Sequence, residues 1–289
     1  MEEIKLKARA KINLSLDVTG RRDNGYHDVK MVMQSIGIYD SITISKTKEP
    51  GITFECSIKF LAQPESNIAY RAAKLLMDEF GIAQGVFINL TKFIPVAAGM
   101  AGGSTDAAAV LYGMNKLFEL GLDEKALCER GVKLGADVPF CIMRGTVLSE
   151  GIGEILTPLP AAVQCHVIVA KPSISVSTKL VYEALDSKEI VKHPNVDAQI
   201  EAIKRGDLKG IVKTMGNVLE DVTIPMHPVI DDIKRKFLQD GALGTMMSGS
   251  GPAVFAIFDD EKLAQDALIN MRNSGLVAQA YLTEFYNRS

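Results

Sequence analysis

The residues best suited to chemistry form a glycine-rich segment, PVAAGMAGGSTDAAAVL, at positions 95–111. Gly99, Gly102 and Gly103 lack a Cβ atom, so they can adopt left-handed conformations and let backbone N–H groups approach a ligand closely. Residues 104–106 (Ser-Thr-Asp) then begin an alanine-rich helix. Because a helix start presents unpaired N–H groups and the positive end of the helix dipole, the segment predicts a polyphosphate site.

The same pattern also fits a flexible loop that merely precedes a capped helix. The chain contains no GxxxxGK[ST] P-loop, no GxGxxG dinucleotide motif and neither the HRD nor the DFG motif of protein kinases. By itself, therefore, the segment leaves both interpretations open.

Three polar residues stand in positions that call for an explanation. Lys11 lies inside an otherwise apolar strand, where a charge is costly unless it is paired or functional, although edge-strand lysines can also serve solubility. Asn13 projects to the same face of that strand. Asp137 precedes Val138-Pro139, and because a residue before proline is held extended, we expect a rigid turn here. An ordinary aspartate in a helix-ending turn would fit as well.

Three segments together resemble the motifs of the GHMP kinases (galactokinase, homoserine kinase, mevalonate kinase and phosphomevalonate kinase relatives). They are ARAKINLSLDV (8–18), the glycine-rich segment, and MMSGSGPAVFAIF (246–258), and they follow the family's order across nearly the whole chain. The resemblance implies an ATP-dependent kinase that phosphorylates a small-molecule alcohol. It also implies an α+β fold of two domains, a ribosomal-protein-S5-like α/β domain over 1–158 and a ferredoxin-like domain over 159–289.

Further segments are similar to one branch of this family. They are GRRDNGYHDV (20–29), LGADVPFCIMRGTVLSEGIGEIL (134–156) and SVSTKLVYEAL (175–185). This branch uses ATP to phosphorylate the 2-hydroxyl of a cytidylylated methylerythritol in non-mevalonate isoprenoid biosynthesis. Arg9 and Met100 depart from the branch's usual proline and leucine at positions that carry no chemistry.

Two alternatives to this branch remain. Another GHMP kinase would act on mevalonate, homoserine or a sugar, and a catalytically inactive GHMP-fold protein would serve as a binding module. The presence of both Lys11 and Asp137 disfavours the inactive protein, because a binding module does not need that pair.

The resemblance assigns roles to the catalytic and nucleotide-binding residues. Asp137 would accept the proton of the substrate hydroxyl, and Lys11 would keep that carboxylate ionised and stabilise charge on the phosphoryl group. Mg²⁺ is implied, with Ser104 or Thr105 as a possible hydroxyl ligand and the metal-binding residues otherwise undetermined. The residues implied to contact ATP are Asn67, Lys92, Pro95, Val96, Ala97, Ala98, Gly99, Met100, Ala101, Gly102, Gly103, Ser104 and Thr105.

The resemblance also implies an acceptor site. Asn13 would hydrogen-bond the methylerythritol part, and Thr178 would contact the acceptor as well. Tyr26 and Tyr182 would stack on the two faces of the cytosine ring, and His27 would hydrogen-bond its polar edge. Tyr182 also has the helical spacing of an ordinary core residue, which is the alternative interpretation.

Composition narrows the class of protein. The 289 residues are 47% apolar and 23% charged, which is typical of globular domains, and the net charge of −3 disfavours a nucleic-acid surface. The four cysteines form no CxxC pair, so we expect buried structural thiols and a reducing cytoplasm. The charged N-terminus and the lack of ~18 uninterrupted apolar residues predict neither a signal peptide nor a membrane anchor. We expect a monomer or homodimer, with His166, His193 and His227 structural or on the surface.

Hydrophobic periodicity predicts the elements of the first half. Strands are expected over 4–18, 35–45 and 85–91. A helix capped by Ser66 or Asn67 buries an apolar face, and two further helices span 104–120 and 123–134, the latter stopped by Gly135. The apolar face consists of Ala69, Ala72, Ala73, Leu76 and Phe80.

The proline-containing stretch 152–165 has no clear period and is the expected domain boundary. Beyond it, the order of elements predicts the ferredoxin-like β-α-β-β-α-β pattern, with the first helices as insertions. The expected strands are 166–171, 243–247, 253–258 and 277–285, and the expected helices are 178–186, 197–220, 228–239 and 260–273.

Overall fold

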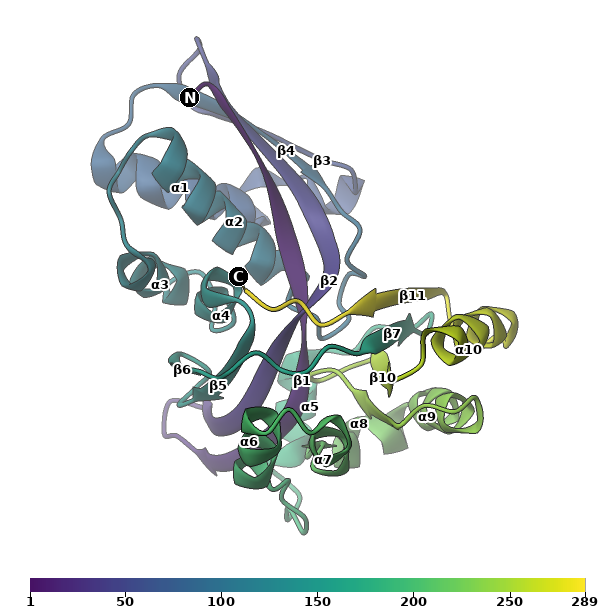
Figure 1. Ribbon diagram of the computed structural model, residues 1–289. Helices are drawn as coiled ribbons and strands as arrows, with labels where there is room; N and C mark the ends of the chain where they lie inside the picture. The colour runs from purple at the N-terminus through teal and green to yellow at the C-terminus, as the bar shows by residue number, and fades with distance from the viewer. Residues whose placement is uncertain (289) are drawn as a thin grey trace. The chain divides into compact units, whose positions relative to one another are not determined.

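The computed structural model describes residues 1–288 and consists of two compact units, each built from several stretches of chain (Figure 1). Unit 1 comprises Met1–Ala10, Ile38–Ile94 and Ala101–Arg144, and unit 2 comprises the rest. Strands β1 (Glu3–Arg21) and β2 (His27–Thr47) contribute residues to both units. A single domain boundary after residue 158 stays a prediction.

The sheet of unit 1 is built on the second half of β2. Strand β4 (Gly85–Thr91) pairs antiparallel with residues 41–47 of β2 and parallel with β3 (Ile52–Cys56). Alternate residues of β4 and of the second half of β2, from Ile38 to Ile44, are buried, as a sheet with one covered face requires. The strands predicted at 4–18, 35–45 and 85–91 are confirmed, although β1 continues to Arg21 and β2 already begins at His27.

Helix α1 (Ile68–Phe80) follows two short 3₁₀ turns, η1 (Lys59–Leu61) and η2 (Pro64–Ser66). Of the two predicted caps, Asn67 is the one used, because its side-chain oxygen accepts a hydrogen bond from the N–H of Ala69 at 2.9 Å. The predicted apolar face is buried except at its last position, since Phe80 is 39% exposed.

Helix α2 (Gly102–Leu117) runs beside α1 over the strands of unit 1 (Figure 1). Gly113 allows it to lie close to the sheet, because a Cβ there would come within 2.7 Å of the side chains of Leu6 and Ile44. Helices α3 (Glu124–Val132) and α4 (Val138–Met143) follow. The predicted helices over 104–120 and 123–134 are confirmed with shifted ends, and α2 begins two residues earlier than expected.

Unit 2 contains the C-terminal four-stranded sheet. Its strands β7 (His166–Lys171), β9 (Gly244–Met247), β10 (Val254–Phe258) and β11 (Gln279–Glu284) lie in the order β11-β7-β10-β9, with every neighbouring pair antiparallel. Helices α9 (Val229–Gln239) and α10 (Glu261–Asn273) pack on this sheet (Figure 1). The predicted ferredoxin-like pattern is confirmed.

The rest of unit 2 surrounds the first half of β2 and the second half of β1. Strand β5 (Thr146–Glu150) pairs with residues 31–34 of β2 and with β6 (Ile155–Pro158), and the short β8 (Gly216–Asn217) pairs with β1. Helices α5 (Thr178–Leu185) and α8 (Glu220–Met226) complete it. No helix within residues 1–288 is long and apolar enough to span a bilayer.

One predicted helix is wrong. The stretch 197–220 forms α6 (Val196–Lys204) and α7 (Leu208–Lys213), followed by β8, instead of one helix. Gly206 adopts a left-handed φ of 65°, which ends α6, and the side chain of Asp207 caps α7 by accepting from the N–H of Gly210 at 2.9 Å. A glycine stop followed directly by an aspartate cap outweighs the continuous helical period.

Candidate functional site

The backbone of the glycine-rich segment differs from the prediction. Left-handed φ angles occur at Ala97, Gly99 and Ala101, whereas Gly102 and Gly103 belong to the first turn of α2. A Cβ on Gly99 would lie 2.0 Å from the carbonyl oxygen of Ser248, so close packing requires glycine there. The part of the segment that belongs to unit 2, residues 95–100, is therefore a tightly packed loop.

The third sequence motif supports this loop. Ser248 donates its hydroxyl proton to the carbonyl of Gly99 at 3.0 Å, and the N–H of Lys11 donates to the carbonyl of Met100 at 3.2 Å. Asn217 holds the motif itself, donating from Nδ2 to the carbonyls of Met247 and Gly249 at 2.9 and 2.8 Å. Parts of all three motifs thus meet within unit 2.

The start of α2, in unit 1, presents one exposed residue and one half-buried hydroxyl. Gly103 is exposed, Ser104 is half-buried, and Thr105 is buried at 2% exposure. Ser104 is consequently the more accessible of the two hydroxyls considered as metal ligands. Within residues 1–288 no group of three or more His, Cys, Asp or Glu side chains is arranged to hold a metal ion.

A buried triad of Asp40, Lys92 and Asp106 lies next to that helix start. The ammonium group of Lys92 donates to Asp40 and, at 2.6 Å, to Oδ2 of Asp106. Asp40 also accepts from the backbone N–H groups of Phe93 and Ile94, the latter at 2.8 Å. All three side chains are at most 4% exposed. The triad therefore connects β2, the residue that follows β4, and the N-terminal part of α2.

Burial and charge act in opposite directions on this triad. Burial raises the pKa of Asp106 well above its usual range, more than the nearby Lys92 lowers it. Burial alone would lower the pKa of Lys92, but the carboxylates of Asp106 and Asp40 outweigh it and raise that pKa. Oδ1 of Asp106 has no hydrogen-bond partner within residues 1–288. One lysine between two carboxylates leaves a net negative charge, so a proton on Asp106 makes the triad neutral.

The two residues expected near the adenine have structural partners. The ammonium group of Lys92 is used by the triad, and Asn67 uses its oxygen to cap α1 and its Nδ2 to bind the carbonyl of Leu61 at 2.9 Å. Their contact with ATP stays a prediction, and Asp40 and Asp106 were missed as partners. A charge at Asp40 within the apolar alternation of β2 was the available signal.

Lys11 and Asn13 lie side by side, as the strand period predicts. Lys11 donates from Nζ to Oδ1 of Asn13 at 2.8 Å, and Asn13 donates from Nδ2 to the sulfur of Met31 at 3.2 Å. Lys11 is 4% and Asn13 1% exposed. A polar pair buried in an apolar strand is costly unless it serves function, which supports the predicted role.

Asp137 is the residue that precedes α4, and its side chain makes no capping hydrogen bond. The expectation that Val138 is extended is wrong, because Val138 is the first residue of α4. Pro139 then occupies the second helical position, where its missing N–H leaves no hydrogen bond unmade. Asp137 belongs to unit 1 and Lys11 to unit 2, and their pairing stays a prediction.

A histidine cluster (Arg21, His27, Tyr182, Asp186) forms in unit 2. Nε2 of His27 lies 2.6 Å from Oδ1 of Asp186, whose other oxygen is 3.4 Å from Nε of Arg21. The rings of His27 and Tyr182 are 4.9 Å apart between centroids. The sequence predicted His27 and Tyr182 as site residues, and the structure adds Asp186 and Arg21.

The other expected acceptor residues are more exposed. Tyr26 is 56% exposed in the turn before β2, and Thr178 exchanges a 2.8 Å hydrogen bond with the hydroxyl of Ser250. Stacking of Tyr26 and Tyr182 on a base stays a prediction.

The side chains expected to be structural have matching environments. His193 pairs with Asp17 at 2.7 Å, and His166 lies 3.8 Å from Glu284.

The four cysteines form no disulfide. Cys141 and Cys165 are buried as expected, whereas Cys56 and Cys128 are half-buried, contrary to the expectation. Partial burial still raises the pKa of Cys128 to about 11, which keeps it protonated.

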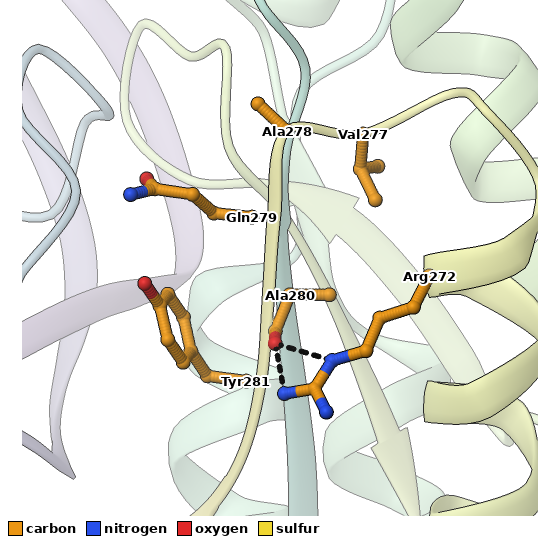
Figure 2. Close-up of a pocket in the computed structure, with 6 residues that line it drawn as sticks. All are labelled: Arg272, Val277, Ala278, Gln279, Ala280 and Tyr281. Atoms are coloured by element: carbon orange, nitrogen blue, oxygen red, sulfur yellow. Dashed lines mark hydrogen bonds between the residues drawn. The ribbon is translucent and has the colours of Figure 1, made fainter.

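A shallow hollow at the edge of the C-terminal sheet contains no predicted site residue (Figure 2). Arg272 donates to the carbonyl of Ala280 at 3.1 Å from Nε and 2.7 Å from Nη2, and the remaining lining is residues 277–281. With its guanidinium group bound to the backbone, and no carboxylate in the lining, this hollow lacks the groups for phosphoryl transfer.

Comparison with known proteins identifies the family that this chain resembles. Residues 67–145 match the family model of the GHMP kinases N terminal domain, and residues 199–275 match GHMP kinases C terminal. The 4-diphosphocytidyl-2-C-methyl-D-erythritol kinase of Lachnospira eligens is 53% identical over 286 residues, 99% of each chain.

Two solved structures are similar along almost the whole chain. A crystal structure of 4-(cytidine 5'-diphospho)-2C-methyl-D-erythritol kinase matches with a TM-score of 0.85 and 30% identity, covering 99% of this chain and 100% of that one. The homoserine kinase of Cytophaga hutchinsonii matches with a TM-score of 0.80 and 22% identity, covering 99% and 95%, and shows a shared fold alone.

Proposed function

The chain belongs to the GHMP kinase family, and we propose that it transfers the γ-phosphoryl group of ATP to the 2-hydroxyl of 4-diphosphocytidyl-2-C-methyl-D-erythritol. The family and the two-domain fold inferred from three sequence motifs are confirmed. The observation that carries the choice of acceptor is the 53% identity to a kinase of that name over 99% of both chains. The product would enter non-mevalonate isoprenoid biosynthesis.

In the proposed reaction, Asp137 accepts the proton of the attacking hydroxyl, and Lys11 stabilises charge on the transferred group. Phosphoryl transfer depends mainly on positioning and charge stabilisation, so a buried lysine held by Asn13 at 2.8 Å is suited to this task. The glycine-rich segment would hold the phosphates, as the family resemblance implies. The exposed backbone at Gly103 supports that role.

Mg²⁺ would neutralise charge on the β- and γ-phosphates. The described residues include no cluster of acidic ligands, so the ion would be held largely by phosphate oxygens and water, with Ser104 as a possible hydroxyl ligand. Such a site is common for Mg²⁺, which keeps several waters and binds through substrate phosphates.

One assay tests the proposal. ADP release is followed with purified protein, ATP, Mg²⁺ and, in separate reactions, the cytidylylated methylerythritol, mevalonate, homoserine and galactose. We expect turnover with the first acceptor alone. Turnover with another acceptor would assign a different GHMP kinase activity, and no turnover with any acceptor would favour a binding module.

A further inference from the structure

The histidine cluster contains a carboxylate that the proposed reaction does not use. Asp186 directly follows α5, and its N–H donates to the carbonyl of Tyr182, four residues earlier, at 3.1 Å. Residues four apart face the same side of a helix, so α5 presents a ring and a carboxylate together. His27 meets both of them, with its ring against Tyr182 and its Nε2 against Asp186.

The contact with Asp186 determines which nitrogen of His27 carries the proton. An ionised carboxylate is only an acceptor, so Nε2 must donate across the 2.6 Å separation. Nε of Arg21 lies 3.4 Å from the other oxygen of Asp186, so that oxygen is engaged in an ion pair and Oδ1 faces His27. In the neutral ring, Nδ1 is then the acceptor. Within residues 1–288 Nδ1 has no hydrogen-bond partner, and the side chain is 8% exposed.

An acceptor at Nδ1 distinguishes between pyrimidines. Cytosine carries an exocyclic amino group, a donor, where uracil carries a carbonyl oxygen, an acceptor. A donor facing Nδ1 makes a hydrogen bond, whereas an acceptor there leaves two lone pairs opposed and both groups unsatisfied. The His27 side chain is only 8% exposed, so an unpaired polar group that faces it is poorly compensated by water and disfavours the wrong ligand.

We propose that Asp186 is a specificity-determining positioning residue, which holds His27 with Nε2 protonated so that Nδ1 accepts from the amino group of cytosine and disfavours uracil. This inference rests on the proposed function, because it requires a cytidine-containing acceptor. Asp186 itself contacts His27 and Arg21, and it acts on the base only through the imidazole.

The test compares Asp186→Asn with the unmodified protein. An asparagine can either donate to Nε2 or accept from it, so the tautomer is no longer determined. We expect the ratio of kcat/KM for the cytidylylated over the uridylylated acceptor to fall roughly tenfold to a hundredfold, the range of a hydrogen bond to a charged group. The change should appear in KM with kcat retained, because the cytosine ring of the acceptor is distant from its reacting hydroxyl.

A spectroscopic readout is independent of turnover. In ¹⁵N NMR of the unmodified protein above pH 7.5, His27 should show a protonated Nε2 and an unprotonated Nδ1, and Asp186→Asn should give a mixture. Asp186→Glu, which retains the carboxylate, should recover most of the preference. Asp197→Asn is the matched control, since that exposed carboxylate pairs with Lys30 of β2 and has no contact with His27.

The outcomes separate the two proposals. If the unmodified protein phosphorylates the cytidylylated acceptor, but Asp186→Asn changes neither the cytidine-to-uridine ratio nor the His27 nitrogen signals, the role of Asp186 is refuted. If the protein does not phosphorylate that acceptor, the proposed function fails instead. The NMR signals of His27 then still report whether Asp186 holds the tautomer.

Discussion

The buried triad and the histidine cluster both combine carboxylates with cationic or titratable groups, yet they differ in what is left over. In the triad, the ammonium of Lys92 and both oxygens of Asp40 are used within the protein. In the histidine cluster, one ring nitrogen remains after Asp186 has bound the other. Oδ1 of Asp106 is also left over, but it is fully buried and no ligand can reach it, so the triad stabilises structure. An oriented, unused nitrogen in a less buried cluster can recognise a ligand.

The two clusters also differ in how far their side chains are exposed to solvent. The three side chains of the triad are at most 4% exposed, whereas Arg21 is 62% and Asp186 19% exposed. Charges that are removed from water destabilise a protein strongly when one partner is lost, whereas partly solvated pairs contribute little to stability. The triad should therefore respond mainly in stability and the histidine cluster mainly in binding.

The largest expected effect is that of Lys92→Met. It leaves the buried carboxylate of Asp40 without its cation, and we expect a loss of about 3–5 kcal/mol in the free energy of unfolding, measured by denaturant titration. Adding Asp40→Asn to Lys92→Met should restore part of this loss, because it removes the buried charge while keeping an oxygen that accepts from the N–H groups of Phe93 and Ile94. Lys74→Met, which removes an exposed pair with Asp78, is the control and should cost below about 1 kcal/mol. Equal losses of unfolding free energy for Lys74→Met and Lys92→Met would show that the buried triad contributes no more to stability than an exposed ion pair.

Asp137→Asn separates chemistry from both clusters. Asp137 belongs to neither, so we expect unchanged stability and ATP affinity, but a decrease in kcat on the order of 10²-fold or more from the loss of the base. Steady-state kinetics with saturating ATP measure it. Glu129→Gln removes an exposed carboxylate on α3 and is the charge-matched control. Near-normal turnover of a well-folded Asp137→Asn preparation would exclude Asp137 from the reaction.

Tyr182→Ala tests the histidine cluster as a ligand site. Stacking on a base is worth about 1–3 kcal/mol, so the affinity for the cytidylylated acceptor should fall roughly tenfold to a hundredfold, with ATP affinity little changed. Calorimetric titration of each ligand measures this. Leu180→Ala, at a residue 56% exposed on the same helix, should bind normally. Two results together would rule out a cytidine pocket: unchanged acceptor affinity in Tyr182→Ala, and failure of CMP to compete with the acceptor in the unmodified protein.

The effect expected to be smallest per step of the experiment, here one pH unit, concerns the proton on Asp106. Because its pKa is raised in the folded protein, its contribution to stability is complete below the unfolded value of about 3.9 and is lost as the pH rises through the folded value. The stability of the unmodified protein relative to Asp106→Asn should thus decline with increasing pH, by at most about 1.4 kcal/mol per pH unit. Unfolding titrations between pH 4 and 8 measure the slope, with Asp78→Asn as the control. A flat difference would place no proton on Asp106.

The order of elements was largely predictable from the sequence. Alternation and helical spacing identify strands and helices because side-chain burial follows the backbone period, and Asn67 was a correct cap candidate. The errors lie where a local signal overrides that period. Gly206 and Asp207 divide a predicted helix, and Val138 is helical despite the proline that follows it.

The family, and with it a list of site residues, also followed from the order and content of three motifs. What only the tertiary structure decided is which polar atoms are already used. Lys92 and Asn67 have partners far along the chain or in a neighbouring turn, Gly99 packs on Ser248, and Asp186 reaches back to His27 across 159 positions. A sequence motif specifies residue types, but hydrogen-bond partners depend on distances that exist only after the chain has folded. Polar groups from distant positions are buried together, and local periodicity does not encode which of them meet.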